Sequence, residues 1–461
     1  MKKTILALSG IALMACNTEE PTNGVIVSGN VTHTEAPYLL VYDLSRSLAD
    51  SPADTIALQD DGSFSDTLKM SGKKVNLIAG RKRIPLYFSD GANLDITVDM
   101  NDFEKTLRIT GKGAAINNYL QQKSEIQKEI IGDTNHYMLS EDEFLKRITA
   151  VKEAQKEKLN AIVELDSDFK KKEEKNLAYE YLGEIQKYPQ YHPYYTKKDE
   201  FEVSEGFLRG LDTLDMEDQS AFEFSPAYKS LLESSYRDLA IKKTAKDSTI
   251  AQDIAFLEEV SANRNEKIKN ALLYDAARIY MSFSGDPERY YQTYDKYATD
   301  ETYKKHVRAD HEALLRVSEG RPSPKFVAYE NHAGGTTSLD DLKGKYVYID
   351  VWATWCGPCL REIPSLKELE ADYHDKPIQF VSVSIDTEDA YEKWKTMVKE
   401  RELGGIQLLA DNAWESEWVE DYLIKGIPRF ILIDPQGNIV NYNAPRPSSE
   451  EIRKVFEELD I

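Results

Sequence analysis

The spacing of hydrophobic residues divides most of the chain into three successive regions. From 25 to 112, short apolar runs alternate with turn residues, a pattern typical of antiparallel strands. From 113 to 320, apolar positions recur at helical spacing among many Lys and Glu residues. From 322 to 461, apolar strands alternate with amphipathic helices, which indicates a central sheet with helices on both faces. We predict a multidomain protein with an N-terminal antiparallel, sandwich-like β domain, a central α-helical region and a C-terminal α/β domain.

Individual elements follow from the same pattern. Strands are expected at 25–31, 38–42, 64–68, 75–79, 84–88 and 94–98, and helices at 141–163, 169–187, 227–243, 251–263 and 267–283. In the last region, strands are expected at 346–352, 380–385, 407–409, 430–433 and 438–440, and helices after 359, at 391–400, at 414–422 and from 448.

Two segments are predicted to lack regular structure. Residues 188–195, rich in Tyr and interrupted by Pro, are expected to form a loop. Their rings either line a peptide-binding surface or pack onto neighbouring helices, and we favour packing because Tyr is routinely half-buried. Residues 321–324, Arg-Pro-Ser-Pro, are expected to form a stiff linker at a domain boundary.

The first sixteen residues are typical of a bacterial lipoprotein signal. Two Lys residues precede a short apolar segment at 4–12, and Leu-Met-Ala-Cys follows at 13–16. This motif resembles a lipobox, in which Cys16 is the first mature residue and carries the lipid; an ordinary secretory signal is the alternative. We expect a signal peptide at 1–15, a polar tether at 16–24 and a lipid-anchored protein of the cell envelope, either facing the periplasm or in the outer membrane.

Composition excludes several classes of protein. The chain has 461 residues, three Cys and a formal net charge of −22. No nucleic acid is expected as a partner, because phosphates require basic patches. Three Cys residues exclude a disulfide-stapled scaffold and a four-cysteine zinc site. With Cys16 assigned to a lipid, Cys356 and Cys359 remain, separated by two residues.

This cysteine pair lies where a strand passes into a helix, an arrangement typical of thioredoxin-like redox proteins. Residues 351–359, Val-Trp-Ala-Thr-Trp-Cys-Gly-Pro-Cys, resemble the thioredoxin active site almost residue for residue. With Leu-Lys-Gly-Lys at 342–345 and Gly-Ile-Pro at 426–428, they resemble the extracytoplasmic thiol-disulfide oxidoreductases of the TlpA/ResA group. The whole chain is similar, more loosely, to lipoproteins of Bacteroidetes-type bacteria that end in such a domain.

The resemblance covers 322–461 and implies a thioredoxin fold with roles for individual residues. Cys356 matches the nucleophile and Cys359 the resolving cysteine, and the two are expected to form the redox-active disulfide. Pro364 matches the proline that kinks the active-site helix. The implied substrate groove comprises Trp355, Gly357, Pro358, Ile427 and Pro428, the last matching the cis-proline that faces the active site. Arg429 replaces the Thr usual after that proline and is expected to place a charge beside the groove.

Two carboxyl groups are candidates for the proton shuttle of the implied reaction. Asp350 matches the buried aspartate of thioredoxin, and Glu362 matches a glutamate near the cysteines in the TlpA/ResA group. The sequence leaves open which of them serves. A polar strand residue at the edge of the sheet is the alternative for Asp350. A solvated helix residue is the alternative for Glu362.

Elementary chemistry supports the roles of the two cysteines. A thiolate attacks a disulfide, and a helix N-terminus at Cys356 favours an anion, so we expect its pKa to lie below that of a free cysteine. Cys359 can then attack the mixed disulfide, and a carboxyl in a partly apolar site can accept its proton. A structural disulfide or half of a zinc site is the alternative for this pair.

The sequence therefore predicts a membrane-anchored protein-disulfide reductase. Its expected partners are disulfide-containing proteins and a membrane thiol relay that donates electrons; neither a cofactor nor a metal is expected. A narrower hypothesis makes apocytochrome c the substrate, in cytochrome c maturation. A hypothesis of another class is a binding or scaffold lipoprotein with a secondary redox site, in which residues before 320 recruit partners.

Overall fold

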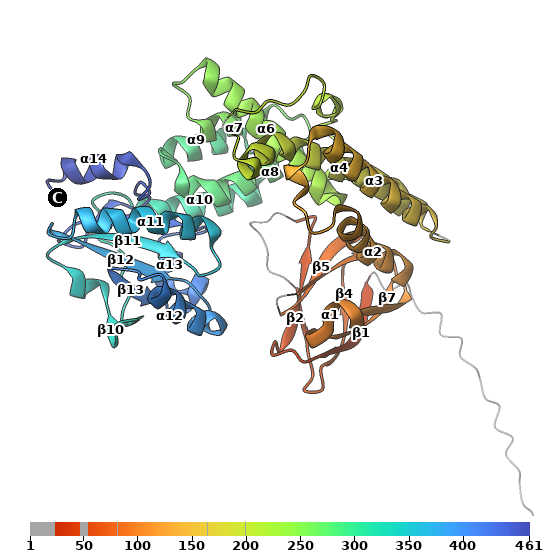
Figure 1. Cartoon of the computed structure of the whole chain (residues 1–461), viewed down its shortest axis with the longest axis horizontal. Helices are drawn as coiled ribbons and strands as arrows, with labels where there is room; N and C mark the ends of the chain where they lie inside the picture. The colour runs from red at the N-terminus through yellow and green to blue at the C-terminus, as the bar shows by residue number, and fades with distance from the viewer. Residues whose placement is uncertain (1–23, 47–53, 81, 164, 199) are drawn as a thin grey trace, which may run out of the picture. The chain divides into compact units, whose positions relative to one another are not determined.

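The computed structural model describes residues 24–46, 54–80, 82–163, 165–198 and 200–461 (Figure 1). The expected signal peptide, Cys16 and most of the tether lie outside the described residues. The chain divides into two compact units, Met1–Leu232 and Glu233–Ile461. None of the helices in the described ranges is long and apolar enough to span a membrane. The predicted three-part fold class is confirmed, while the domain boundaries stay a prediction.

The β domain of the first unit contains two four-stranded sheets. One has the order β4-β1-β7-β8, built from β1 (Val25–Thr32), β4 (Ser63–Leu68), β7 (Asn93–Asp99) and β8 (Arg108–Lys112). The other has the order β3-β2-β5-β6, built from β2 (Tyr38–Asp43), β3 (Asp54–Ala57), β5 (Lys73–Ala79) and β6 (Lys82–Phe88). Alternate side chains of these strands form one buried apolar cluster, which accounts for the alternating pattern in the sequence.

This domain differs from the expectation in two ways. The strands β3 and β8 were not expected, because each buries a single side chain, Ile56 or Ile109, and so shows no alternation. The domain is also not purely antiparallel, since β1 pairs in parallel with β7. The connection between them passes through the other sheet, so no local turn signal reports this pairing.

The helices of the first unit follow the β domain. They are α2 (Ala114–Ile131), α3 (Glu141–Asn160), α4 (Ser167–Thr196), α5 (Gln219–Phe224) and the beginning of α6 (Pro226–Lys246). The short helix α1 (Phe103–Thr106) lies between β7 and β8, and the 3-10 turns are Met100–Asp102, His136–Met138 and Arg209–Thr213.

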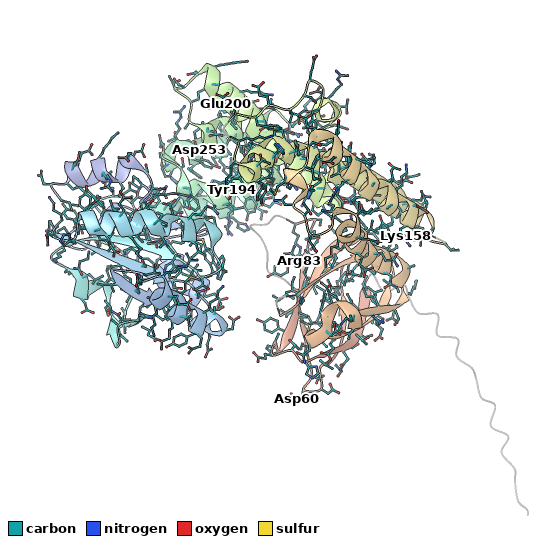
Figure 2. The ribbon with its side chains drawn as sticks, in the orientation of Figure 1. Asp60, Arg83, Lys158, Tyr194, Glu200 and Asp253 are labelled. Carbon is teal, nitrogen blue, oxygen red and sulfur yellow. A yellow bond between two sulfur atoms is a disulfide. The ribbon has the colours of Figure 1, made fainter. Side chains whose placement is uncertain are left out.

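The predicted Tyr-rich loop is wrong, because α4 continues through it with Pro189 and Pro193 inside the helix. Tyr188 and His192 are buried and four residues apart, so they lie on one face of the helix. The Tyr188 hydroxyl donates to the carbonyl of Leu139 at 2.6 Å, and these tertiary contacts hold the helix together across its prolines. These two residues pack as the favoured alternative predicts, whereas Tyr194, labelled in Figure 2, has 65 % of its surface exposed.

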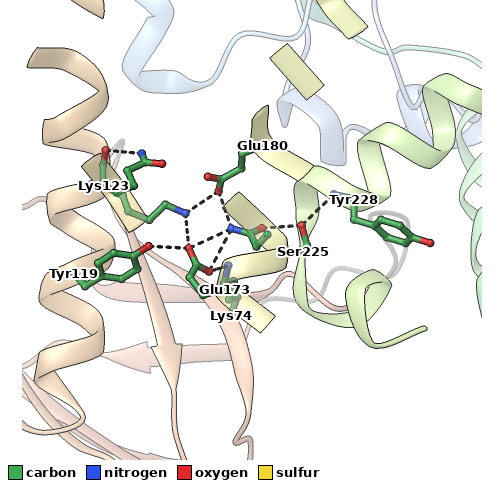
Figure 3. A network of polar contacts seen from close by, with 9 residues as sticks. Lys74, Tyr119, Lys123, Glu173, Glu180, Ser225 and Tyr228 are labelled. Carbon is green, nitrogen blue, oxygen red and sulfur yellow. Dashed lines mark hydrogen bonds and ion pairs between the residues drawn. The ribbon is translucent and has the colours of Figure 1, made fainter. Parts of the chain in front are cut away.

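A buried ionic network joins α2 and α4 to the β domain (Figure 3). The carboxylate of Glu173 is fully buried and accepts from Lys74 Nζ at 2.7 Å and Lys123 Nζ at 2.5 Å. The Tyr119 hydroxyl donates to the same carboxylate at 3.3 Å. Burial opposes the charge of Glu173, but attraction to Lys123 and Lys74 outweighs it and lowers the pKa of Glu173 below its usual value. Every charge of this network has a partner, so it fixes the packing of three elements.

The second unit begins within α6 and continues with four helices before its sheet. These are α7 (Gln252–Ser261), α8 (Glu266–Tyr280), α9 (Pro287–Tyr297) and α10 (Glu301–Arg316), with a 3-10 turn at Met281–Phe283. Side chains of Asn265, Asp286 and Asp300 accept from backbone N–H groups of the first turns of α8, α9 and α10. These caps explain where the three helices begin.

The rest of the second unit is built on a seven-stranded sheet of order β10-β9-β13-β12-β11-β14-β15. Its strands are β9 (Tyr329–Asn331), β10 (Thr336–Thr337), β11 (Tyr346–Trp352), β12 (Ile378–Ser384), β13 (Ile406–Leu409), β14 (Arg429–Ile433) and β15 (Ile439–Asn441). Its helices are α11 (Gly357–Asp372), α12 (Tyr391–Glu400), α13 (Glu417–Asp421) and α14 (Glu450–Glu458). Helices α11 and α14 cover one face, and α12 and α13 the other (Figure 1).

The predicted linker at 321–324 is part of the structure of this unit. Pro322 forms a β-bridge with Asn438, and the backbone N–H of Ser323 donates to the carbonyl of Gly437 at 3.0 Å. The hydroxyls of Ser323 and Tyr422 share a hydrogen bond of 2.6 Å. The segment therefore lines the sheet beside β15, because its backbone groups have partners there.

Candidate redox site

Cys356 lies at the N-terminus of α11 and is joined to Cys359 by a disulfide. Its sulfur accepts the backbone N–H of Cys359 at 3.1 Å, so it occupies the capping position of a 16-residue helix. At this position the unpaired N–H groups and the helix dipole stabilise a negative charge on sulfur. Both cysteines are nearly buried, whereas the neighbouring Trp355, Gly357 and Pro358 are exposed. A polypeptide can therefore contact the exposed rim before it reaches the sulfur.

The loop that carries Cys356 is held by a residue that the sequence did not single out. Asp386 is 2 % exposed and accepts from the backbone N–H of Thr354 at 2.9 Å and from its hydroxyl at 2.8 Å. The Ser384 hydroxyl donates to the same carboxylate at 2.7 Å. Strands β11 and β12 are parallel with Trp352 beside Ser384, so Asp386 lies at the same edge as the loop. An Asp just after a buried parallel strand was the signal that could have identified it.

Pro428 follows a cis peptide bond from Ile427, as the resemblance implies. Strand β14 runs antiparallel to β11 with Arg429 opposite Val351. The next residues outward, Pro428 and Trp352, therefore lie at the same edge of the sheet, where the cysteine loop begins. Pro428 is buried, and Ile427 is half-buried beside it. The structure thus brings the two halves of the predicted groove to one edge.

Asp350 lies within β11, with 7 % of its surface exposed. Burial, and secondarily the negative charge of Glu362, raise the pKa of Asp350 from 3.8 to about 8. The group therefore holds its proton at neutral pH and exchanges it in the range where thiols ionise. The central position of β11 in the sheet rules out the alternative of a polar residue on an edge strand.

Glu362 lies on α11 and is 9 % exposed, so it is not a solvated helix residue. Its carboxylate accepts from the backbone N–H of Ser448 at 3.2 Å and from the hydroxyl at 3.1 Å. Arg446 Nη1 lies 3.7 Å from one of its oxygens. These donors belong to the segment before α14, which no motif marks. Glu362 therefore has hydrogen-bond donors of its own, and its negative charge acts on Asp350.

Arg429 follows the cis-proline as expected, but its side chain is 1 % exposed, so its charge is buried and does not reach the groove surface. Its guanidinium donates to the Ser282 carbonyl at 2.7 Å and to the Ser282 hydroxyl at 2.8 Å. Burial lowers the pKa of Arg429 to about 10. The helical part of the second unit supplies these partners, which the sequence of the cysteine domain alone does not reveal.

Exposed aromatic side chains border the cysteine pair. Trp355 is 54 % exposed, and its ring centre lies 6.4 Å from that of Trp414, which is 37 % exposed. Large exposed apolar side chains that cluster mark binding surfaces for other proteins.

Among the residues that the structure describes, no group of three or more His, Cys, Asp or Glu side chains could hold a metal ion.

Comparison with known proteins assigns this part of the chain. Residues 318–459 match the model of the Redoxin family. The thioredoxin domain of a thiol-disulfide oxidoreductase from Bacteroides vulgatus is 30 % identical, with 97 % of that chain and 31 % of this one covered, at a TM-score of 0.28. Residues 318–459 are therefore a Redoxin domain at the C-terminus of the chain. The predicted thioredoxin-like fold and the resemblance to the TlpA/ResA group are confirmed.

Other relatives of this redoxin carry the same description. The thiol-disulfide oxidoreductase ResA of Bacillus thuringiensis is 27 % identical over 144 residues, which are 31 % of this chain and 80 % of that protein. The thioredoxin-like protein YneN of Bacillus subtilis is 28 % identical over 138 residues, covering 30 % of this chain and 78 % of that protein. The redoxin is therefore a protein-disulfide oxidoreductase, as predicted. The matches cover about a third of the chain and leave the preceding regions unassigned.

Proposed function

We propose that this redoxin is a membrane-anchored protein-disulfide reductase of the cell envelope that works through Cys356 and Cys359. The placement of Cys356 at the N-terminus of α11 carries the proposal, because its sulfur accepts the Cys359 N–H at 3.1 Å. That environment favours the thiolate that attacks a disulfide. The Gly-Pro dipeptide between the cysteines resembles that of the reducing thioredoxins, which supports the reducing direction.

The reaction starts from the dithiol form and balances in two exchanges. The Cys356 thiolate attacks one sulfur of the substrate disulfide, forms a mixed disulfide and releases the other substrate sulfur as a thiolate, which takes up a proton. Cys359 loses its proton and attacks Cys356, which forms the intramolecular disulfide and releases the second substrate sulfur. We assign the proton acceptor to the ionised form of Asp350, which is the minor form at neutral pH, because burial and Glu362 raise its pKa to about 8, near that of a thiol. Two electrons move from the cysteine pair to the substrate, and a membrane thiol relay is the donor proposed to restore the dithiol.

Trapping tests the roles of the two cysteines. In the Cys359→Ser variant the mixed disulfide on Cys356 cannot resolve, so we expect covalent adducts with disulfide-containing proteins of the envelope on non-reducing gels. A Cys356→Ser variant is the matched control and should give none. Adducts of equal yield in both variants, or none in either, would exclude this mechanism.

The redox potential tests the direction. Proteins of this fold range from about −270 mV for thioredoxin to about −120 mV for the strong oxidant DsbA. We expect equilibration with a dithiol buffer to give a value in the lower half of this range. A value near the oxidising end would reverse the proposed direction and leave the oxidoreductase assignment intact.

The membrane anchor is tested at Cys16. We expect the mature N-terminal peptide to carry a diacylglyceryl group in mass spectrometry and the protein to partition with membranes. The Cys16→Ser variant should appear in the soluble fraction. The apocytochrome and scaffold hypotheses stay predictions: normal cytochrome c content in a deletion strain would exclude the first, and full activity of fragment 322–461 on native substrates would exclude the second.

A further inference from the structure

Residues from the helices that precede the redoxin domain contact the loop of the cis-proline on both sides of that proline. Lys425, just before that loop, forms an ion pair with Asp310 of α10. A Cβ atom on Gly426 would lie 3.3 Å from the ring of Phe283, so the ring rests directly on the loop backbone. The guanidinium of Arg429 lies 3.9 Å from the centre of the same ring. The contacts therefore fall on both sides of the cis-proline.

The segment at the end of α8 is fixed in turn by the redoxin domain. Arg429 donates two hydrogen bonds to Ser282, and Asn443 Nδ2 donates to the carbonyl of Phe283 at 3.2 Å. Arg429 contacts the carbonyl and hydroxyl of Ser282 and the ring of Phe283. Hydrogen bonds as well as apolar contact therefore fix the position of the segment. Residues 281–283 thus occupy a defined place beside the edge that carries Cys356 and Pro428.

A pocket of about 420 Å³ is lined in part by this segment, through Phe283 and Ser284. Its lining includes Arg237, Asp253 (Figure 2), Phe256, Tyr280, Phe283 and Tyr290. The Arg237 guanidinium lies 5.8 Å from the ring centre of Phe256 and 5.7 Å from that of Tyr280. Phe283 belongs both to this pocket and to the contact with Gly426. A ligand in the pocket would therefore touch the ring that also touches the cis-proline loop.

We propose that the segment 281–284 forms one wall of the substrate groove, and that its pocket takes an aromatic side chain of the polypeptide whose disulfide is reduced. This rests on the proposed function. The occupant follows from the chemistry of the lining: four aromatic rings and a guanidinium stack favourably on another ring. The volume lies within the range of ligand pockets and exceeds what one aromatic side chain fills, so backbone or water can enter with it. The exposed Trp355 next to Cys356 offers apolar contact to the same polypeptide.

The test compares two peptides that each carry one disulfide and differ by a Trp or a Ser residue a few positions from the cysteine. We expect the unaltered full-length protein to reduce the Trp peptide with the higher kcat/KM, mainly through a lower KM. Phe256→Ala should reduce the ratio of the two kcat/KM values about tenfold, which corresponds to ~1.4 kcal/mol. Leu315→Ala is the matched control, because Leu315 lies on α10 with 49 % of its surface exposed and outside the pocket lining.

The outcomes separate this inference from the proposed function. Equal loss for both peptides in Phe256→Ala would assign a purely structural role to the pocket and overturn the inference, as would an unchanged ratio. A second variant, Phe283→Leu, keeps an apolar side chain against Gly426 and should also lower the ratio if the ring is a wall of the groove. Hydroxyethyl disulfide, which has no aromatic group, is the probe for the reductase activity itself. If the unaltered dithiol protein fails to reduce it, the proposed function is at fault rather than the pocket.

Discussion

The replacement Asp350→Asn should stabilise the redoxin domain at neutral pH. Folding raises the pKa of Asp350 from 3.8 to about 8. Stability due to the bound proton is therefore fully present below pH 3.8 and is lost as the pH rises through 8, because the unfolded chain ionises freely across that interval. An Asn side chain has nearly the same shape as Asp and cannot ionise. The variant therefore keeps the stability that the native protein loses as the pH rises.

The size of the effect follows from the two pKa values. At pH 7 the unfolded carboxyl lies about three pH units above its pKa, and each unit is worth ~1.4 kcal/mol, so the ionisable group costs about 4 kcal/mol of stability. The amide introduces an N–H₂ group into a buried site, and an unpaired polar group there costs ~1–3 kcal/mol. We therefore expect a net gain of about 1–3 kcal/mol at pH 7. Below pH 4 the gain should vanish and the variant should be equal to or weaker than the native protein.

Urea unfolding followed by tryptophan fluorescence measures this difference. All five tryptophans lie between 352 and 418, so their emission reports the redoxin domain of the full-length chain. The midpoint should be recorded from pH 4 to pH 9 for the native protein, for Asp350→Asn and for Asp421→Asn, an exposed carboxyl of the same domain, as control. A difference between native and Asp350→Asn that does not grow with pH, or one matched by the control, would refute the reasoning. Loss of the proton acceptor should also slow turnover, by about a hundredfold.

The remaining predictions concern two other buried carboxylates. Glu173→Gln leaves Lys74 and Lys123 without a buried counter-charge, and we expect it to destabilise the first unit by ~3–5 kcal/mol. Far-UV circular dichroism during urea unfolding should show this loss while tryptophan emission keeps its midpoint; a shift of both would contradict an effect confined to that unit. Asp386→Ala removes both acceptors of Thr354, and we expect the tryptophan-monitored midpoint to fall by the equivalent of ~1–3 kcal/mol. Disulfide reduction should slow in the same variant, and an unchanged rate would show that the loop does not depend on Asp386.

Much of the fold could be predicted because its buried positions follow one period at a time. Buried positions alternate in strands such as β1 and β7 of the β domain, and β11 and α12 have the predicted bounds. The prediction of a loop in the Tyr-rich part of α4 was wrong because Pro189 is a local signal for a break in a helix. The hydrogen bond from Tyr188 to Leu139 joins residues far apart in sequence and leaves no such signal. The parallel pairing of β1 with β7 was missed for the same reason, because the spacing of apolar residues does not show which strands pair.

The residues of the candidate site divide in the same way into those that a local motif reveals and those that only distant contacts reveal. Cys356 and Pro428 are visible in the sequence because each sits in a short motif. Asp386 has no motif, and its importance comes from a parallel register that brings the ends of two strands together. Arg429 was expected to place a charge beside the groove because its neighbours in sequence belong to it, but its side chain is buried and its partner Ser282 comes from 147 residues earlier. Contacts made across such a separation become visible only when the chain is folded.

Strand β1 has a consequence for the order in which the chain can fold. It is the first described strand, yet it lies in the interior of its sheet, with Val27 opposite Asp66 on one side and beside Leu94 on the other. During vectorial synthesis neither partner exists when β1 emerges, and its second edge stays unpaired until β7 has followed. An apolar strand with open edges is prone to wrong pairing. Strand β1 can therefore complete its pairing only after β7 has been made, at about the hundredth residue of the chain.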